Sequence, residues 1–151
     1  MVKVQILANG EGLDLPSYAT SGAAGMDLRA ALLALPGRPA FLMIAPGEVE
    51  LVPCGFAVAV PFGHELQVRA RSSMGWRQII VPNAPGTIDS DYRGEVAVFL
   101  LNLSPLPFKI SRGDRIAQAI LAPVAHCEWD PVLVLPPTQR GAGGFGSTGV
   151  K

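Results

Sequence analysis

The sequence predicts an all-β protein with a jelly-roll-like β-barrel or sandwich fold, one short helix and a glycine-rich C-terminal arm. Glycine (17 residues) and proline (14 residues) recur every few positions, which leaves no room for a long amphipathic helix. Between these turn residues lie short runs rich in β-branched and aromatic residues, spaced as in sandwiches, jelly rolls and barrels.

The expected strands follow one another along the chain. They cover residues 2–7, 41–44, 48–52, 56–60, 65–70, 96–102 and 115–123. Turn signals separate them, and Pro53-Cys54-Gly55 is expected to divide the third strand from the fourth. A short helix is expected at residues 72–77, where Ser72 and Ser73 could cap the first turn.

We expect residues 1–135 to form one domain. A chain of 151 residues, 49% of them apolar, can bury roughly two thirds of its unfolded surface in a single core. Residues 136–151 differ, because the stretch 140–149 carries one large apolar side chain, Phe145, and cannot order itself by burial. We interpret this segment as an arm that closes over an active site, although its composition alone fits a disordered tail equally well.

The charge pattern favours a small ligand. Twelve basic and twelve acidic residues are scattered along the chain, so no electrostatic footprint for duplex nucleic acid or an anionic membrane is present. The longest apolar run, residues 96–101, is far too short to span a bilayer, and a cytoplasmic protein is expected. Cys54 and Cys127 form no C-x-x-C pair, which argues against a zinc site, and both are expected to be buried thiols.

Two segments carry groups that suit phosphate. Arg71, Ser72 and Ser73 would offer a guanidinium, two hydroxyls and free backbone amides at a strand end, although a plain helix cap has the same sequence. The stretch 140–149 offers Arg140, glycine amides that can approach an anion closely, two hydroxyls and an aromatic ring.

Three acidic residues are candidates for chemistry. Residues 86–95 are expected to form a β-hairpin, in which Asp89 could orient or deprotonate a water while Asp91 satisfies backbone amides of the turn. Asp27 lies in an otherwise apolar strand and therefore needs a partner, either an arginine or a hydrated metal. The sequence leaves both partners open.

Taken in order, five segments closely resemble the five motifs of the trimeric all-β dUTP pyrophosphatase (dUTPase) family. They are residues 24–30, 71–75, 83–95, 113–118 and 140–149, and they span nearly the whole chain. The resemblance implies the dUTPase-like fold, a homotrimer with active sites shared between subunits, and Mg²⁺ as the cofactor. It implies hydrolysis of dUTP to dUMP and pyrophosphate by water attack on the α-phosphate, which limits uracil incorporation into DNA and supplies dUMP for thymidylate synthesis.

The resemblance also implies a role for each matching residue. Asp89 and Gln118 would be the catalytic residues: Asp89 would activate the attacking water, and Gln118 would help to hold the phosphates. Asp27 would hold hydrated magnesium through water. Tyr92 would pack under the deoxyribose and exclude a 2′-hydroxyl. Uracil would be bound by Asn83 and by the backbone around Ile88 and Ala97, with Phe145 stacked over the ring. The phosphates would be bound by Arg71, Ser72 and Ser73, and the γ-phosphate by Arg140, Ser147 and Thr148. Thr87 and Gly146 are the remaining implied substrate contacts.

Two other functions remain as alternatives. A dCTP deaminase-like enzyme would share the β scaffold, but its catalytic segment is missing from this chain. A nucleotide-sensing regulatory trimer would bind dUTP and signal to a partner. Retention of Asp89 argues against a loss of catalysis, while a second, regulatory role stays open.

Overall fold

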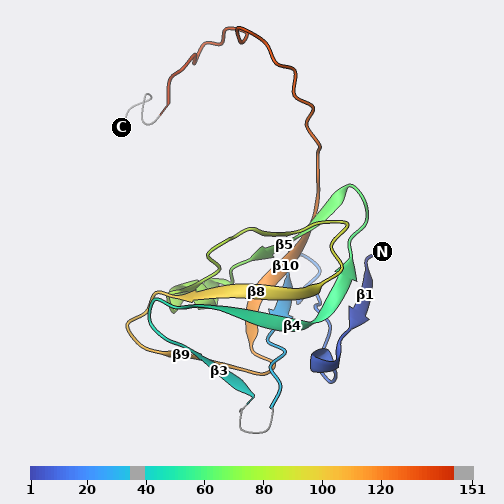
Figure 1. The fold of residues 1–151 in the computed structure, drawn as a ribbon, viewed down its shortest axis with the longest axis vertical. Coiled ribbons are helices and arrows are strands. Elements are labelled where there is room, and N and C mark those ends of the chain that lie inside the picture. The colour runs from blue at the N-terminus through green and yellow to red at the C-terminus, as the bar shows by residue number, and fades with distance from the viewer. Residues whose placement is uncertain (35–39, 145–151) are drawn as a thin grey trace.

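The computed structural model describes residues 1–34 and 40–144 and contains two four-stranded sheets packed against each other, with a small third sheet at one end (Figure 1). The first sheet has the order β1 (Lys3–Ile6), β4 (Val49–Ala59), β8 (Glu95–Asn102) and β6 (Ile79–Ile80). The second has the order β2 (Met26–Arg29), β10 (Arg115–Pro123), β5 (His64–Arg69) and β7 (Gly86–Ile88). In the third, β3 (Phe41–Ile44) pairs with β9 (Phe108–Ser111). The predicted all-β, jelly-roll-like fold is confirmed.

The turn expected within residues 53–55 is wrong. One strand, β4, runs through this segment, and its register with β8 shifts between Pro53 and Ala57. Gly55 has a φ of 78°, a conformation that glycine adopts without steric cost. The turn-like residues therefore form a bulge, which bends and twists the strand without ending it.

The helix forms where it was expected, but its capping was predicted wrongly. In α1 (Ser72–Trp76) the N-cap residue is Arg71, and no side chain caps the helix. Ser72 is therefore the first helical residue. A 3-10 turn that the sequence did not predict, η1 (Ala8–Gly10), follows β1.

The expected hairpin at residues 86–95 is also wrong. β7 pairs with β5 in the second sheet, whereas β8 pairs with β4 in the first. Ile88 and Val96, on either side of residues 89–94, are both buried, so each strand contributes to the core from a different sheet. The connection at residues 89–94 therefore crosses from one sheet to the other at the end of the sandwich.

The core lies between the two sheets. Its largest fully buried apolar side chains are Leu28, Ile44, Val52, Ile79, Val96, Val98, Leu100, Ile110 and Ile116. Burial of each such side chain is worth about 1.5–3 kcal/mol. Asn102 is buried with them, and its Nδ2 donates to the carbonyls of Ile44 and Leu106 at 2.8 Å each. These bonds fix the turn that follows β8.

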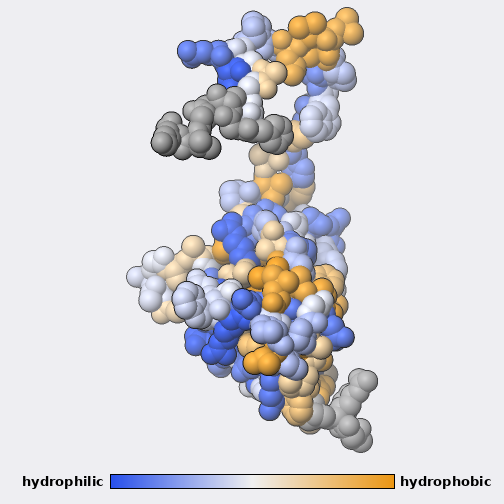
Figure 2. All heavy atoms as spheres, turned by 90° about the vertical axis from the view of Figure 1, so that its left-hand side faces the viewer, coloured by the Kyte–Doolittle hydropathy of each residue, from blue (hydrophilic) through white to orange (hydrophobic). Residues whose placement is uncertain are grey.

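Beyond β10 the described chain leaves the body as an extended segment (Figure 1). Its side chains are exposed up to residue 142, and a hydrophobic cluster stands on this segment away from the body (Figure 2). That cluster consists of Val132, Leu133, Val134 and Leu135. Cys54 is buried as predicted, but Cys127 lies on the exposed segment, so its predicted burial is wrong. Within residues 1–34 and 40–144, no helix has the length and apolar character needed to cross a membrane.

Candidate functional site

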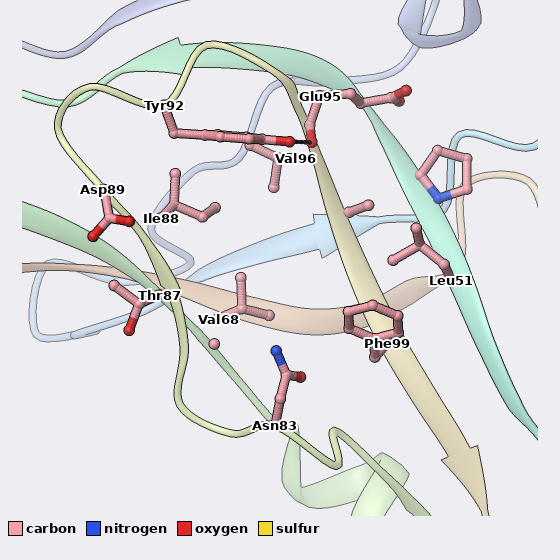
Figure 3. A pocket seen from close by; sticks show the side chains of 13 residues that line it. Leu51, Val68, Asn83, Thr87, Ile88, Asp89, Tyr92, Glu95, Val96 and Phe99 are labelled. Atoms are coloured by element: carbon pink, nitrogen blue, oxygen red, sulfur yellow. Dashed lines mark hydrogen bonds between the residues drawn. The ribbon is translucent and has the colours of Figure 1, made fainter.

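A pocket of about 540 Å³ opens where residues 89–94 cross between the sheets (Figure 3). Six residues singled out from the sequence line it: Asn83, Thr87, Ile88, Asp89, Tyr92 and Ala97. Asn83 and Tyr92 stand at opposite ends of the pocket in Figure 3. The pocket has the size of a small-ligand site, with a few polar groups placed among apolar walls.

Strand alternation builds one wall of this pocket. In β8, Val96, Val98 and Leu100 point into the core, so Ala97 and Phe99 face the other way. Leu51 of β4 lies opposite Phe99 in the register and also lines the pocket. Leu51 and Phe99 were not predicted as site residues, although the period-two pattern from residue 96 to residue 100 would have placed Phe99 on the same face as Ala97.

Tyr92 is held in a defined position although 45% of its surface is exposed. Its hydroxyl donates a hydrogen bond to the carbonyl oxygen of Glu95 at 3.1 Å. Its ring lies on Gly94, where an added Cβ would overlap the hydroxyl. A glycine at position 94 therefore allows the ring to form a fixed wall.

Asn83 depends on a second glycine. A Cβ at Gly86 would lie 3.1 Å from Nδ2 of Asn83 and 3.4 Å from Cβ of Val68. The missing side chain of Gly86 leaves room for the Asn83 amide, which can both donate and accept hydrogen bonds at this end of the pocket.

Asp89 lies at the start of the connection between the sheets and is exposed. Its backbone carbonyl accepts a hydrogen bond from the Tyr92 amide at 3.2 Å. Within residues 1–34 and 40–144, its carboxylate forms no hydrogen bond or salt bridge, so both oxygens can accept a proton from water. The Asp91 carboxylate likewise accepts none there, and its predicted role in satisfying turn amides is not observed.

A second cluster surrounds Asp27, which lies in β2 at the edge of the second sheet. Oδ1 of Asp27 lies 2.8 Å from Nε of Arg71, and Oδ2 lies 3.2 Å from Nη1 of Arg115. The shorter contact lacks hydrogen-bond geometry, so it is an electrostatic contact between half-buried groups. Of the two partners that the sequence allowed for Asp27, the structure shows arginine. Arg115 was not predicted as a site residue.

The cluster also connects the strands next to it. Nη1 of Arg71 donates to the carbonyl of Arg115 at 3.0 Å and approaches Oγ of Ser73 at 3.4 Å. Gln118 lies opposite Asp27 on one side of β10 and opposite Arg69 on the other. A Cβ at Gly25 would lie 3.3 Å from Cβ of Gln118, so glycine there gives the glutamine room.

Cationic side chains gather beside this cluster. A pocket of about 270 Å³ is lined by four cationic side chains, Arg71, Arg77, Lys109 and Arg115, together with Ser73 and one carboxylate, Asp114. Oδ2 of Asp114 accepts a hydrogen bond from the backbone amide of Ser111 at 2.8 Å. Guanidinium groups present fixed donors that match phosphate oxygens, so this surface suits a polyphosphate. A pocket of about 390 Å³ opens on the other side of Asp27 and contains a second carboxylate, Asp14.

The two groups of candidate residues line different pockets. Asn83, Asp89 and Tyr92 line the pocket between the sheets, whereas Arg71 and Asp27 line the pockets beside β10. None of the pockets of about 540, 270 and 390 Å³, all in the part of the chain that the structure describes, is lined by both groups. One chain in this conformation therefore does not unite them.

Of the site residues predicted in the C-terminal arm, only Arg140 lies in the part of the chain that the structure describes. Nε of Arg140 donates to the carbonyl of Gly143 at 2.8 Å, in an exposed turn. Phe145, Gly146, Ser147 and Thr148 lie outside the described residues.

Comparison with known proteins adds an independent line of evidence. The dUTPase family model matches residues 11–149. A deoxyuridine 5'-triphosphate nucleotidohydrolase from Rhizobium etli is 54% identical over 145 residues, which cover 95% of this chain and 90% of the relative. The protein of the same name from Desulfotalea psychrophila is 53% identical over 141 residues, covering 93% and 90%.

Solved structures show a similar fold at low sequence identity. A mutant dUTPase of Staphylococcus bacteriophage 80alpha with dUpNHpp superposes with a TM-score of 0.85 at 21% identity, covering 99% of both chains. A mutant dUTPase from phage phi11 of S. aureus, described with a structural Mg(II) ion, gives a TM-score of 0.75 at 19% identity, covering 89% of this chain and 97% of the other.

Proposed function

The chain belongs to the dUTPase family and hydrolyses dUTP to dUMP and pyrophosphate, and on that premise we propose that the pocket between the sheets holds the deoxyuridine. The observation that carries the proposal is the meeting of an amide, a carboxylate and an aromatic ring in one pocket (Figure 3). These groups can read a base edge, activate water and contact a sugar, respectively.

In this proposal the end of the pocket at Asn83 recognises the base, and the end at Tyr92 recognises the sugar. The Asn83 side chain and the backbone of Ile88 and Ala97 hydrogen-bond uracil, and Thr87 lines the same wall. Tyr92 packs under the deoxyribose, and its fixed ring leaves no space for a 2′-hydroxyl. A site whose polar groups become buried against uracil rejects cytosine, because those groups would then be left unpaired.

The chemical step uses Asp89 as the base. Its carboxylate takes a proton from a water molecule while the water oxygen forms a bond to the α-phosphorus. The bond between that phosphorus and the oxygen bridging to the β-phosphate breaks, and pyrophosphate leaves with the electron pair. Positioning and charge neutralisation supply most of the acceleration in such reactions.

The phosphates bind to the cationic cluster. Arg71 donates to their oxygens, and the hydroxyls of Ser72 and Ser73 contribute further bonds, with Gln118 assisting from β10. Because Asp27 contacts two arginines, it also orients the guanidinium of Arg71.

Magnesium fits this cluster as a hydrated ion. Within the described residues no group of three His, Cys, Asp or Glu side chains could enclose a metal, so the phosphates themselves must supply most ligands. Asp27 would hold such an ion through water, beside the pocket that also contains Asp14. The ion would neutralise the charge that develops on the phosphate oxygens.

We propose a homotrimer in which the nucleoside pocket of one subunit meets the phosphate cluster of another. The two groups line separate pockets of one chain, and both are required for hydrolysis. Leu51 and Phe99 form a cross-strand pair that lines this pocket, and both side chains are exposed. A neighbouring subunit at the pocket would remove these apolar side chains from water, which supports an assembly.

Residues 1–135 would form the β domain of each subunit, and residues 136–151 the arm that closes over an active site. Arg140, Ser147 and Thr148 would contact the γ-phosphate, while Phe145 stacks over uracil beside Gly146. Closure would exclude bulk water and complete the site. The exposed turn at Arg140 is compatible with an arm that takes its final position on nucleotide.

Subunit mixing tests the shared site. Asp89→Asn and Arg71→Ala should each inactivate the enzyme, because they remove groups from different pockets. Unfolding and refolding the two proteins together should restore about one quarter of wild-type activity, since a quarter of shared sites combine the two intact surfaces. No recovery, with trimers present by light scattering, would place each complete site within one chain.

A labelling experiment tests the point of attack. Hydrolysis in water enriched in ¹⁸O should place the label in dUMP and leave pyrophosphate unlabelled. Label in pyrophosphate would mean attack at the β-phosphorus and would remove the proposed alignment of Asp89 with the α-phosphate.

A further inference from the structure

We propose that the side chains of Asn9 and Glu95 form a clamp that positions Tyr92, and that this clamp contributes to the preference for deoxyribose over ribose. Both are positioning residues in this proposal: Asn9 does not line the nucleoside pocket, and Glu95, which does, acts through its carboxylate on Asn9 and Gly55. The inference rests on the proposed function, because it assigns to Tyr92 the contact with the sugar.

One carboxylate oxygen joins three distant segments. Oε1 of Glu95 accepts a hydrogen bond from Nδ2 of Asn9 at 2.7 Å and another from the backbone amide of Gly55 at 2.8 Å. Glu95 is the first residue of β8, Gly55 lies in the β4 bulge, and Asn9 lies in η1. Hydrogen bonds to a charged acceptor are stronger than neutral ones, so Glu95 fixes the start of β8 against both segments.

The base of the clamp is rigid. A Cβ on Gly10 would overlap the backbone carbonyl of Gly55, so η1 and the bulge are in direct backbone contact. The Leu7 amide also donates to the carbonyl of Gly55 at 2.9 Å. The bulge that replaces the expected turn therefore places the Gly55 amide where it can donate to Glu95.

The clamp connects to the pocket through the same residue. The backbone carbonyl of Glu95 accepts the hydrogen bond from the Tyr92 hydroxyl, and the Tyr92 amide donates to the carbonyl of Asp89. If the start of β8 shifts, the acceptor for the tyrosine hydroxyl shifts with it. A displacement of about 1 Å in a positioning contact can cost about 100-fold in rate.

The test compares the ratio of kcat/KM for dUTP to kcat/KM for UTP across matched variants. Asn9→Ala and Glu95→Ala should lower this ratio about tenfold, as should Tyr92→Phe, which keeps the ring but removes the hydroxyl. Glu95→Gln should retain most of the ratio, because its amide oxygen can still accept from both donors.

A control removes comparable hydrogen bonds at the other end of the same strand. Asn102→Ala loses the bonds to Ile44 and Leu106 and should lower the melting temperature while leaving the substrate ratio unchanged. This variant separates loss of stability from loss of positioning.

Clamp variants that keep the wild-type ratio, while Tyr92→Phe loses it, would overturn the proposal. Should Glu95→Ala fail to fold, Asn9→Ala decides the matter alone, since it removes one hydrogen bond from a half-buried position. A wild-type enzyme that shows no preference for dUTP over UTP would instead contradict the proposed role of Tyr92, and with it the proposed function.

Discussion

The nucleoside pocket is formed by packed strands, whereas the segment after β10 makes almost no packing contacts. Two packed sheets supply the pocket walls, and Tyr92 and Asn83 stand where glycines and hydrogen bonds place them. The described segment after β10 instead exposes apolar side chains, with Leu133 fully accessible and Val134 at 84%. One part of the proposed site is therefore formed within a single chain, whereas the exposed segment would need a neighbour or a nucleotide to order it.

The largest expected effect lies at the pocket. Asp89→Asn should lower the rate of pyrophosphate release about 10³-fold, because an amide cannot take the proton from water. Asp89 is exposed, so the melting temperature should stay close to that of the wild type. Titration with a non-hydrolysable dUTP analogue should show that binding survives. A variant that still turns over at the wild-type rate would exclude Asp89 as the base.

The next effect lies in the segment. Deletion of residues 140–151 should reduce kcat about 100-fold, since the site would remain open to water. The core should be unaffected, because the exposed turn at Arg140 contributes no buried contact. Removal of Val150 and Lys151 alone, beyond the last motif, is the control and should leave the rate unchanged. Full activity after the longer deletion would refute the assignment of the arm.

A smaller effect is expected from Gly94→Ala. The added Cβ would overlap the Tyr92 hydroxyl, so the ring must move and the free energy of unfolding should fall by about 1 kcal/mol. We expect kcat/KM for dUTP to fall about tenfold, measured by initial rates. Gly22→Ala is the matched control, because nothing lies within 4 Å of its Cβ. Equal kinetics for the two variants would show that the ring position is unimportant.

The smallest expected effect is a difference in reactivity between the two thiols. Cys54 lies buried in the packed sheets, and Cys127 lies on the exposed segment after β10. Burial, with the charge of Glu95 as a second cause, raises the pKa of Cys54 to about 12. A thiol reagent at neutral pH should therefore modify only the exposed Cys127 in the native protein, and both thiols after unfolding. Two reactive thiols in the native state would mean that the β4 bulge opens readily. Cys127→Ser should abolish native labelling.

The same pKa predicts a pH dependence of stability. The native pKa of Cys54 lies above the ordinary value of 9.0, so the unfolded thiol ionises first. This contribution to stability is present below about pH 9 and is lost as the pH rises through about 12. The melting temperature should fall over that range, and less steeply in Cys54→Ala. Identical slopes would show that the native thiol ionises freely.

The strands expected at residues 2–7, 41–44, 65–70, 96–102 and 115–123 are present with small changes at their ends, but β6 and β9 were not predicted. The prediction also failed where one sequence pattern fits two structures. Pro53-Cys54-Gly55 suits a turn or a bulge, and only pairing with β8 selects the bulge. Residues 86–95 suit a hairpin, but β5 was available to pair with β7, so the connection crosses between the sheets. Such choices depend on non-local partners that local propensity does not contain.

The candidate site shows a similar division. The residues to which we assign the chemistry, Asp89, Tyr92 and Arg71, could be singled out because they lie in dense, distinctive motifs. Residues that support them were missed, since Asn9 and Glu95 are 86 positions apart and nothing in either segment signals the hydrogen bond between them. Arg115 was missed for the same reason, because its contact with Asp27 arises from the pairing of β2 with β10.

The measurement that tests the central claim most directly is pyrophosphate release from dUTP, dCTP, dTTP and UTP at equal concentration, with and without magnesium. Release from dUTP that depends on the metal and is far faster than release from dCTP, dTTP or UTP is the result that the pocket and the cationic cluster predict. Binding of dUTP without cleavage would favour a nucleotide-sensing protein, and ammonia released from dCTP would indicate a deaminase. Either outcome would contradict the assignment of Asp89 as the base that activates water for attack on dUTP.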